Sequence, residues 1–321
     1  MKVTQKEMNP FLFTDSNKRY HTYDYYLRHT FGGKVAKIVL DGGFTCPNID
    51  GRCGVGGCIY CSGRGSGDFA ASATLPIAAQ YRLQSEALGK KWQVSGTIAY
   101  FQPHTNTYAP LARLAPLFEE ALAQPRVVGL NIATRADCIE DDVLTYLGEL
   151  SEKTVLTVEL GLQTVHDETA AFINRGHTYL DFLATYRRIR ERAPRVRIGV
   201  HLILGLPGES EEMMLQTVKT VAALHPDEIK LHLLYVVKGT RMAELYENGA
   251  YVPMERQSYV SLAVRAIELL PPEIVLGRLT GDGAPSELLA PLWSRKKLTI
   301  LNDIDKQLFA QNTWQGKKYV T

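Results

Sequence analysis

Four of the five cysteines lie close together in one glycine-rich segment of the chain. Cys46, Cys58 and Cys61 form a Cys-x11-Cys-x2-Cys pattern, and Cys53 lies inside it. Thiolates suit iron–sulfur clusters or zinc, and glycines let the backbone approach a bulky inorganic group closely. In a chain of this size, such a set of cysteines indicates a metal centre before a disulfide framework.

Two interpretations of this segment are open. Three cysteines on a four-iron cluster would leave one iron to chelate the amino and carboxylate groups of S-adenosylmethionine (SAM). An electron from the cluster would then release a 5′-deoxyadenosyl radical, and Tyr60 would lie beside the adenine. The alternative is a structural zinc site with Cys53 as its fourth ligand. The segment follows an apolar run at 35–40, and loops after barrel strands build active sites, which favours the catalytic interpretation.

Short apolar runs alternate with amphipathic stretches along most of the chain, which predicts βα units with right-handed crossovers. The predicted strands are 35–40, 97–101, 127–133, 154–160, 196–204 and 228–235. The predicted helices between them are 75–88, 111–122, 141–150, 179–192 and 211–224. Six such units fit a partial or full barrel better than a small open sheet.

We predict three parts of the chain: an N-terminal segment at 1–34, a barrel at 35–240 and a C-terminal extension at 241–321. The aromatic segment at 19–31 is expected to be a helical cap on the barrel. The extension is expected to be mainly helical, with helices at 254–269 and 302–311 and a short apolar run at 274–276. The fold class is therefore α/β.

The composition is that of an ordinary soluble enzyme, with 45% hydrophobic and 22% charged residues among 321. No apolar run approaches the roughly 20 residues that span a bilayer, and the N-terminus lacks signal-peptide features. We therefore expect a cytoplasmic protein without membrane contact. The net charge of +2 does not indicate nucleic acid. The arginine-rich stretch at 187–197 is either a solvated helix face or a phosphate-contacting patch.

Motifs spread over about residues 18 to 311 resemble the YtqA/YhcC group of radical SAM proteins, which is related to the Elp3 radical SAM domain. The segments that carry the resemblance are AYFQPHTNTYAP, NIATRADC, VELGLQTVHDETAAFINRGH, HLILGLPGE, KLHLLYVVKGT and RLTGDGAPSELLAPLWSRKK. Cys53 is additional to the three cysteines of the family, and TRAD replaces the expected Thr-Arg-Pro-Asp. The resemblance implies a partial (β/α)6 radical SAM barrel, with SAM and a [4Fe–4S] cluster held by Cys46, Cys58 and Cys61.

Polar residues at the ends of the predicted strands are candidates for the SAM site. Similar proteins use a glutamine toward the ribose and an arginine twelve residues later toward the SAM carboxylate, and Gln163 and Arg175 have this spacing. A structural pairing of Glu159 with Arg175 is the alternative. The expected cofactor contacts are Tyr60, Thr134, Glu159, Gln163, Arg175, His201, Gly205 and Pro207.

Three further residues are predicted to be catalytic. Lys230 and His232 alternate with apolar residues in one predicted strand, so they share one face of it. A lysine inside a barrel is costly unless it is paired or functional. Gln102 follows the predicted strand at 97–101.

The resemblance also implies a substrate. The YtqA-type branch is similar to enzymes that modify C5 of the tRNA wobble uridine, here converting a carboxymethylaminomethyl group to an aminomethyl group. A tRNA methyltransferase would complete the side chain, and a flavodoxin or ferredoxin would reduce the cluster. The candidate phosphate contacts are Arg187, Arg188, Lys296 and Lys297. The alternatives are a small metabolite or peptide substrate, and a zinc-stapled RNA-binding protein without catalysis.

Overall fold

The computed structural model describes residues 9–63, 65, 70–281 and 283–320. The chain divides into two compact units. The first unit comprises Leu27–Leu162 and Ala170–Gly199, and the second comprises Met1–Tyr26, Gln163–Thr169 and Val200–Thr321. None of the described helices is long and apolar enough to cross a membrane.

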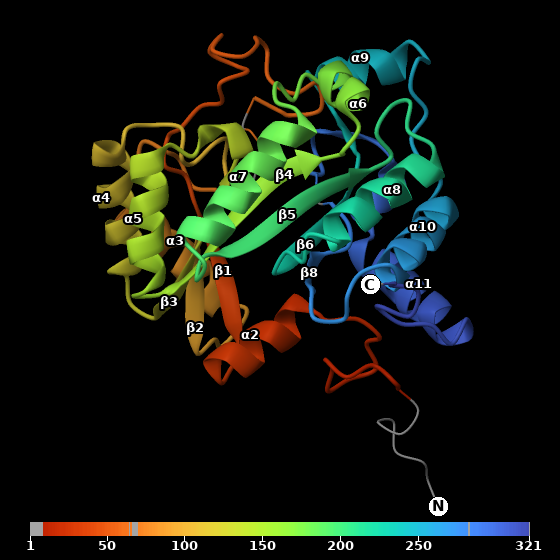
Figure 1. Ribbon diagram of the computed structural model, residues 1–321, viewed down its shortest axis with the longest axis horizontal. Helices are drawn as coiled ribbons and strands as arrows, with labels where there is room; N and C mark the ends of the chain where they lie inside the picture. The colour runs from red at the N-terminus through yellow and green to blue at the C-terminus, as the bar shows by residue number, and fades with distance from the viewer. Residues whose placement is uncertain (1–8, 64, 66–69, 282, 321) are drawn as a thin grey trace, which may run out of the picture. The chain divides into compact units, whose positions relative to one another are not determined.

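The first unit is built on four parallel strands in the order β1-β2-β3-β4 (Figure 1). The strands are β1 (Val35–Leu40), β2 (Gly96–Phe101), β3 (Val127–Thr134) and β4 (Val155–Gln163). The helices that alternate with them are α3 (Ile77–Gly89), α4 (Leu111–Leu122), α5 (Asp141–Ser151), α6 (Asp167–Phe172) and α7 (Tyr179–Arg192). The register aligns Val39 with Tyr100 and Tyr100 with Asn131.

The apolar character of these strands follows from burial against the helices. Every residue of β2 is buried, and its Phe101 meets Phe118 of α4 edge-on, with ring centroids 5.0 Å apart. Helix α7 begins at a capping box, in which the Thr178 hydroxyl accepts from the Asp181 backbone N–H and the Asp181 carboxylate accepts from the Thr178 N–H. The loops at the carboxyl ends of these strands are therefore anchored to buried strands that pack against helices.

The second unit contains the end of β5 (Arg197–Leu204), followed by β6 and β8, in the order β5-β6-β8. Its other strands and helices are α8 (Glu211–Ala222), β6 (Glu228–Leu233), β7 (Val236–Val237), α9 (Arg241–Glu247), α10 (Arg256–Glu268), β8 (Val275–Arg278), β9 (Leu288–Ala290) and α11 (Lys297–Ala310). Helix α10 packs against both α8 and α11, and it is largely buried.

The predicted α/β class with parallel strands is confirmed, and the six predicted strands and five predicted barrel helices all form. The short elements α6, β7, α9 and β9 were not predicted, and α11 begins at Lys297 and not at the predicted residue 302. One further difference concerns a strand of the main sheet. The short apolar run at 274–276 belongs to β8, a strand that pairs in parallel with β6. Three apolar residues after two prolines carry too little periodicity to predict a strand, and the pairing partner lies far back along the chain. The N-terminal helix forms as α2 (Tyr23–Phe31), while the proposed domain boundaries stay predictions.

Candidate active site

The cysteine segment begins directly after β1, at the carboxyl end of that strand. Cys46, Cys58 and Cys61 are all half-buried. A turn joins the last two, because the Cys61 N–H donates to the Cys58 carbonyl at 3.0 Å. The Cys46 carbonyl accepts from the N–H groups of Ile49 and Asp50, at 2.9 and 3.2 Å. These backbone hydrogen bonds give the loop that carries the three thiols a defined conformation.

Two asparagines fasten this loop to the rest of the first unit. Asn48 is 1% exposed, and its amide donates to the Asn174 carbonyl at 2.7 Å and to the Cys58 sulfur at 3.4 Å. The Asn174 amide donates back to the carbonyls of Val55 and Gly57 at 2.9 and 2.7 Å. Asn174 holds a positive φ of 56°, a conformation that non-glycine residues rarely adopt and that often marks functional sites.

The sulfurs of the three predicted ligands influence one another electrostatically. A hydrogen bond from the Cys61 thiol lowers the pKa of Cys58, and the same bond raises the pKa of Cys61. The charges of Cys58 and Cys46 raise the pKa of Cys61 further. Burial raises the pKa of Cys46, against a hydrogen bond from Thr105 that lowers it. The charges of Cys46 and Cys58 therefore both act on Cys61, and the role of the three thiols as one ligand set stays a prediction.

This donor set fits an iron–sulfur cluster. Thiolates are the required ligands, and the site supplies donors to two of the sulfurs: Thr105 Oγ1 lies 3.1 Å from Cys46 Sγ, and Asn48 reaches Cys58. Among the described residues, no three His, Cys, Asp or Glu side chains are placed to hold a single metal ion. A four-iron cluster does not require the thiolates to converge on one ion, because each thiolate binds a different iron.

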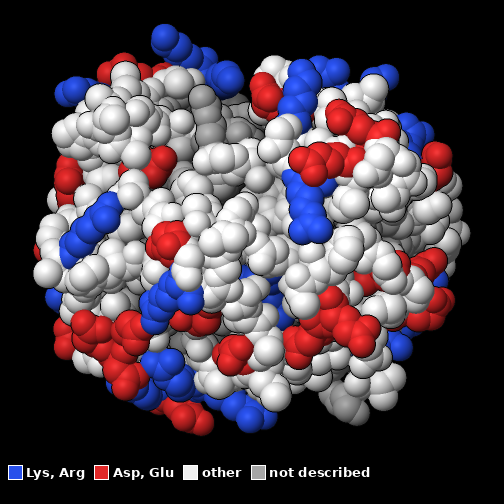
Figure 2. Space-filling view, turned by 90° about the horizontal axis from the view of Figure 1, so that it is seen from above, with Lys and Arg blue, Asp and Glu red and all other residues white. Residues whose placement is uncertain are grey.

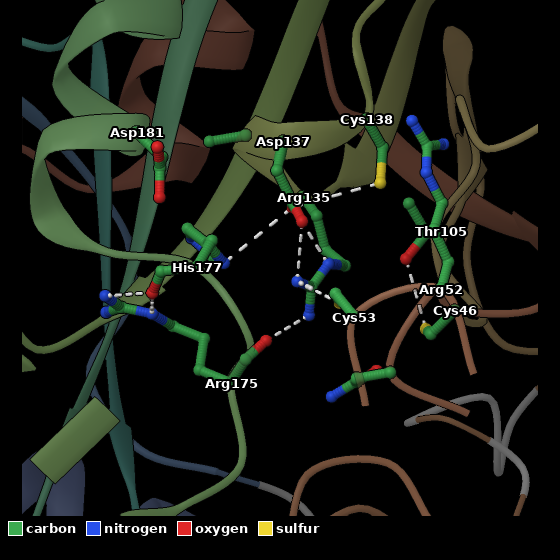
Figure 3. A network of polar contacts seen from close by, with 12 residues as sticks. Cys46, Arg52, Cys53, Thr105, Arg135, Asp137, Cys138, Arg175, His177 and Asp181 are labelled. Carbon is green, nitrogen blue, oxygen red and sulfur yellow. Dashed lines mark hydrogen bonds and ion pairs between the residues drawn. The ribbon is translucent and has the colours of Figure 1, made fainter. Parts of the chain in front are cut away.

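Cys53 has a different environment from the three predicted ligands, because it contacts Arg135 (Figure 3). It is exposed, and Arg135 Nη2 lies 3.6 Å from its sulfur. Arg135 is held in place by Asp137, at 3.0 and 2.8 Å, and by the carbonyl of Arg175. A Cβ added at Gly176 would come within 2.9 Å of the Cys53 sulfur, so this position needs glycine. Cys53 thus contacts an arginine network that ends at the Arg175 backbone.

His177 lies beside this network and is buried, with 2% of its side chain exposed. Neither of its ring nitrogens has a hydrogen-bond partner, and the nearest carboxylate oxygen, on Asp137, is 3.8 Å from Nδ1. Burial, together with the charge of Arg175, lowers the pKa of His177 to about 3. The imidazole is therefore neutral over the physiological range.

Arg175 is buried, with 1% exposed. Its guanidinium donates to the His177 carbonyl, at 2.9 and 2.8 Å, and to the Leu162 carbonyl. These bonds fix the end of β4 and the turn before α7. The contact of Arg175 with the SAM carboxylate stays a prediction. In the structure its guanidinium binds backbone carbonyl groups.

Gln163 ends β4 with a positive φ of 64°. A glutamine gains nothing locally from this conformation, so surrounding structure must maintain it. The positive φ marks the last residue of the strand as a position where the backbone is strained. The contact of Gln163 with the SAM ribose stays a prediction.

Glu159 is the centre of a buried polar layer across four strands. Its carboxylate accepts from Lys37 at 3.1 Å, from Tyr100 at 2.7 Å and from Asn131 at 2.8 Å. Its side chain is 0% exposed, whereas that of Lys37 is 20% exposed. Buried carboxylates persist in proteins when they are paired and hydrogen-bonded in this way. The sequence predicted Glu159 but none of these partners.

The structure also gives the surroundings of five other residues that were predicted to contact SAM or substrate. The Tyr60 hydroxyl hydrogen-bonds to Cys58, and the Thr134 hydroxyl meets that of Thr107. Gln102 follows β2 directly. Gly205 has a φ of 91°, and its carbonyl accepts from Tyr251 at 2.8 Å; Pro207 follows it in the turn before α8.

Two histidines on adjacent strands of the second unit come together. The rings of His201 and His232 lie 5.1 Å apart, centroid to centroid. On the same face of β6, Lys230 is buried, and its Nζ lies 4.0 Å from a carboxylate oxygen of Glu228. The alternation that predicted Lys230 and His232 to share a face is therefore consistent with the strand, while their catalytic role stays a prediction.

Three of the six arginines at 187–197 form ion pairs with acidic residues of the first unit. Arg188 and Arg192 both lie 2.6 Å from Asp141, and Arg195 lies 2.9 Å from Glu152. These contacts favour the solvated helix face over a phosphate patch. Figure 2 shows Lys and Arg interspersed with Asp and Glu over the face seen from above, without an extended area of one sign.

Sequence reasoning missed the side chains that hold the cysteine loop, namely Asn48, Thr105 and Asn174. The only signal for Asn48 is its position two residues after Cys46. Thr105 lies in the polar segment after β2, within the AYFQPHTNTYAP motif that carries part of the family resemblance. Asn106 is buried, and its amide donates to three backbone carbonyls, so it supports this turn.

Comparisons with known proteins identify the family of this chain. The Radical SAM superfamily model matches residues 49–221, and the Radical_SAM C-terminal domain model matches residues 226–310. YtqA of Bacillus subtilis (strain 168) is 45% identical over 309 residues, which cover 96% of this chain and 95% of that protein. A tRNA uridine(34) acetyltransferase of Methanocaldococcus jannaschii is 27% identical over 164 residues, which cover 50% of this chain and 29% of that protein.

Among solved structures, archaeal Methanocaldococcus infernus Elp3 with an N-terminal deletion matches with a TM-score of 0.67 at 19% identity, covering 88% of this chain and 64% of that one. At this identity the likeness concerns the fold. The family matches and the YtqA identity confirm the resemblance inferred from the motifs. The chain belongs to the radical SAM superfamily.

Proposed function

We propose that this protein is a radical SAM enzyme that modifies the C5 side chain of the tRNA wobble uridine, converting a carboxymethylaminomethyl to an aminomethyl group. SAM would serve as the two-electron oxidant, and the carboxymethyl carbons would leave as glyoxylate after addition of water. The observation that carries the enzymatic part is the set of three interacting thiols after β1 in a chain of this superfamily. Cys46, Cys58 and Cys61 would hold the [4Fe–4S] cluster. When bound, that cluster supplies the electron that cleaves SAM to a 5′-deoxyadenosyl radical.

The chain's own residues bind, orient and shield the reactants. Gln163 and His201 are proposed to face the SAM ribose, and Tyr60, beside the cysteines, to face the adenine. Arg175 is proposed to hold the SAM carboxylate. The remaining proposed SAM contacts are Thr134, Glu159, Gly205 and Pro207. Lys230, His232 and Gln102 are proposed to contact the substrate.

The match to a tRNA uridine(34) acetyltransferase over half of the chain supports a wobble uridine as the substrate. A stacked anticodon base cannot enter an active site that lies within a fold, so the nucleotide must be flipped out. In a single-stranded loop this costs on the order of a few kcal/mol. We further propose a cytoplasmic enzyme that is reduced by flavodoxin or ferredoxin and followed by a tRNA methyltransferase.

The direct test uses anaerobically purified holoenzyme, a chemical reductant, SAM and tRNA that carries the carboxymethylaminomethyl group. Nucleoside mass spectrometry should show the aminomethyl product, with formation of 5′-deoxyadenosine. Formation of 5′-deoxyadenosine without any change in the wobble nucleoside would overturn the tRNA substrate and favour a small metabolite or peptide. Protein that binds zinc but neither iron nor sulfide would overturn the radical SAM assignment.

RNA contact is proposed to come from lysines near the start of α11. Lys296 is exposed and Lys297 half-buried. Changing both to glutamate should raise the apparent KM for tRNA and spare SAM cleavage without tRNA, because phosphate contacts contribute binding that weakens with salt. Changing Lys90 and Lys91 to glutamate is the matched control, since these two adjacent lysines are exposed directly after α3 and the charge change is the same. An equal loss in both variants would exclude a specific contact at Lys296 and Lys297.

A further inference from the structure

Two buried side chains donate hydrogen bonds to the sulfurs of two predicted cluster ligands. Thr105 is 0% exposed, and its Oγ1 lies 3.1 Å from Cys46 Sγ. Asn48 is 1% exposed, and its Nδ2 lies 3.4 Å from Cys58 Sγ. Both contacts fall within the distance expected for a donor to sulfur, and neither donor is supplied by the backbone of the loop.

Both donors are held by bonds that do not involve sulfur. The Thr105 N–H donates to the Thr45 carbonyl at 3.2 Å, next to Cys46. The neighbouring Asn106 binds the carbonyls of Phe101, Pro103 and Ala133, which fixes this turn to the ends of β2 and β3. Asn48 is fixed by its 2.7 Å bond to Asn174. Contacts within the fold therefore position the Asn48 amide and the backbone that carries the Thr105 hydroxyl.

Hydrogen bonds to the sulfurs are among the factors that set the reduction potential of an iron–sulfur cluster. Reduction adds negative charge, part of which lies on the thiolates, and a donor stabilises that charge. The neighbouring residues that orient and polarise ligands tune metal sites in this way. Removing a donor should therefore make the cluster harder to reduce.

We propose that Thr105 and Asn48 are positioning residues that raise the reduction potential of the cluster by donating to Cys46 and Cys58. This inference rests on the proposed function, because it requires the [4Fe–4S] cluster. It goes beyond that function by naming two residues that are not among the proposed iron ligands, SAM contacts or substrate contacts. Their effect is on how readily a physiological reductant delivers the electron.

The test uses Thr105→Val, which keeps the branched shape and removes the hydroxyl, with Thr105→Ser as the matched control that keeps it. Iron and sulfide are counted in the anaerobic holoprotein, and the midpoint potential is then measured by a redox titration followed by electron paramagnetic resonance. Thr105→Val should keep its iron and reach a lower ratio of reduced to oxidised cluster at the same solution potential. A tenfold lower ratio corresponds to about 59 mV for a one-electron couple. Thr105→Ser should titrate like the wild type.

The outcomes separate this inference from the proposed function. Wild-type protein without iron and sulfide would overturn the cluster itself. A loaded Thr105→Val protein with the wild-type potential would overturn the inference and leave the function standing. If Thr105→Val cannot be loaded, Thr105→Ala removes the hydroxyl without adding a methyl group against the sulfur. Loss of iron from both, with Thr105→Ser fully loaded, would also overturn the inference, because the hydroxyl would then hold the cluster and not set its potential.

Discussion

Replacement of His177 by leucine should remove an acid sensitivity from the folding stability of this protein. The imidazole is buried without a hydrogen-bond partner, and burial together with the charge of Arg175 lowers its pKa from 6.5 to about 3. The unfolded chain therefore binds a proton at pH values where the native chain does not. For a base whose pKa is depressed on folding, stability is complete above the unfolded pKa and falls as the pH drops below it.

The magnitude follows from the two pKa values. Each unit of pH between them changes the free energy of unfolding by about 1.4 kcal/mol. Going from pH 7 to pH 5 should therefore cost the wild type about 1.9 kcal/mol through this residue alone. This figure depends little on the native pKa, as long as that value lies well below 5. At pH 7 the leucine variant should be about as stable as the wild type or more stable, because it removes two unsatisfied buried nitrogens.

Urea unfolding of the full chain at pH 7 and pH 5 checks this prediction. The wild type should lose about 1.9 kcal/mol more than His177→Leu between the two values. Other groups that titrate in this range, and any loss of cluster in acid, affect both proteins and cancel in the difference. His29→Leu, at an exposed histidine, controls for the loss of an imidazole as such. Equal losses in the wild type and His177→Leu would refute the reasoning that His177 is buried neutral.

Three further predictions concern the site. Cys58→Ala should lose the iron and the visible absorbance of the holoprotein, whereas Cys53→Ala should keep both, because the Cys53 sulfur faces a guanidinium; equal iron loss in the two variants would place Cys53 among the ligands. Gln163→Gly, which keeps the positive φ without strain, should weaken SAM binding about tenfold by calorimetry through loss of one hydrogen bond, and unchanged affinity would remove Gln163 from the SAM site. Lys37→Met should destabilise the protein by roughly 3 kcal/mol in urea unfolding, because it leaves the Glu159 carboxylate buried without its cation, and adding Glu159→Gln should recover most of that loss; no recovery would show that the two residues do not act as a pair.

Much of the fold could be predicted because it is encoded locally. Apolar runs and amphipathic stretches gave all six barrel strands, since a parallel strand buried on both faces is nearly all apolar. Helices α4 and α7 have the predicted bounds, because each begins at a local signal: Pro110 precedes α4, and Thr178 caps α7. Strand β8 was missed, because it owes its existence to pairing with β6 and not to a pattern of its own.

The sequence by itself determined the superfamily and the candidate ligands, since the spacing of Cys46, Cys58 and Cys61 within a glycine-rich loop after a strand indicates thiolate ligation of a metal centre. Only the tertiary structure decided what surrounds those thiols. Thr105 lies 59 residues from Cys46, and Asn174 lies 126 residues from Asn48. The periodicity of apolar residues shows which face of a helix or strand is buried. It therefore predicts where helices and strands form. A hydrogen bond between two loops depends on strand register and on the course of each loop, which no local pattern records.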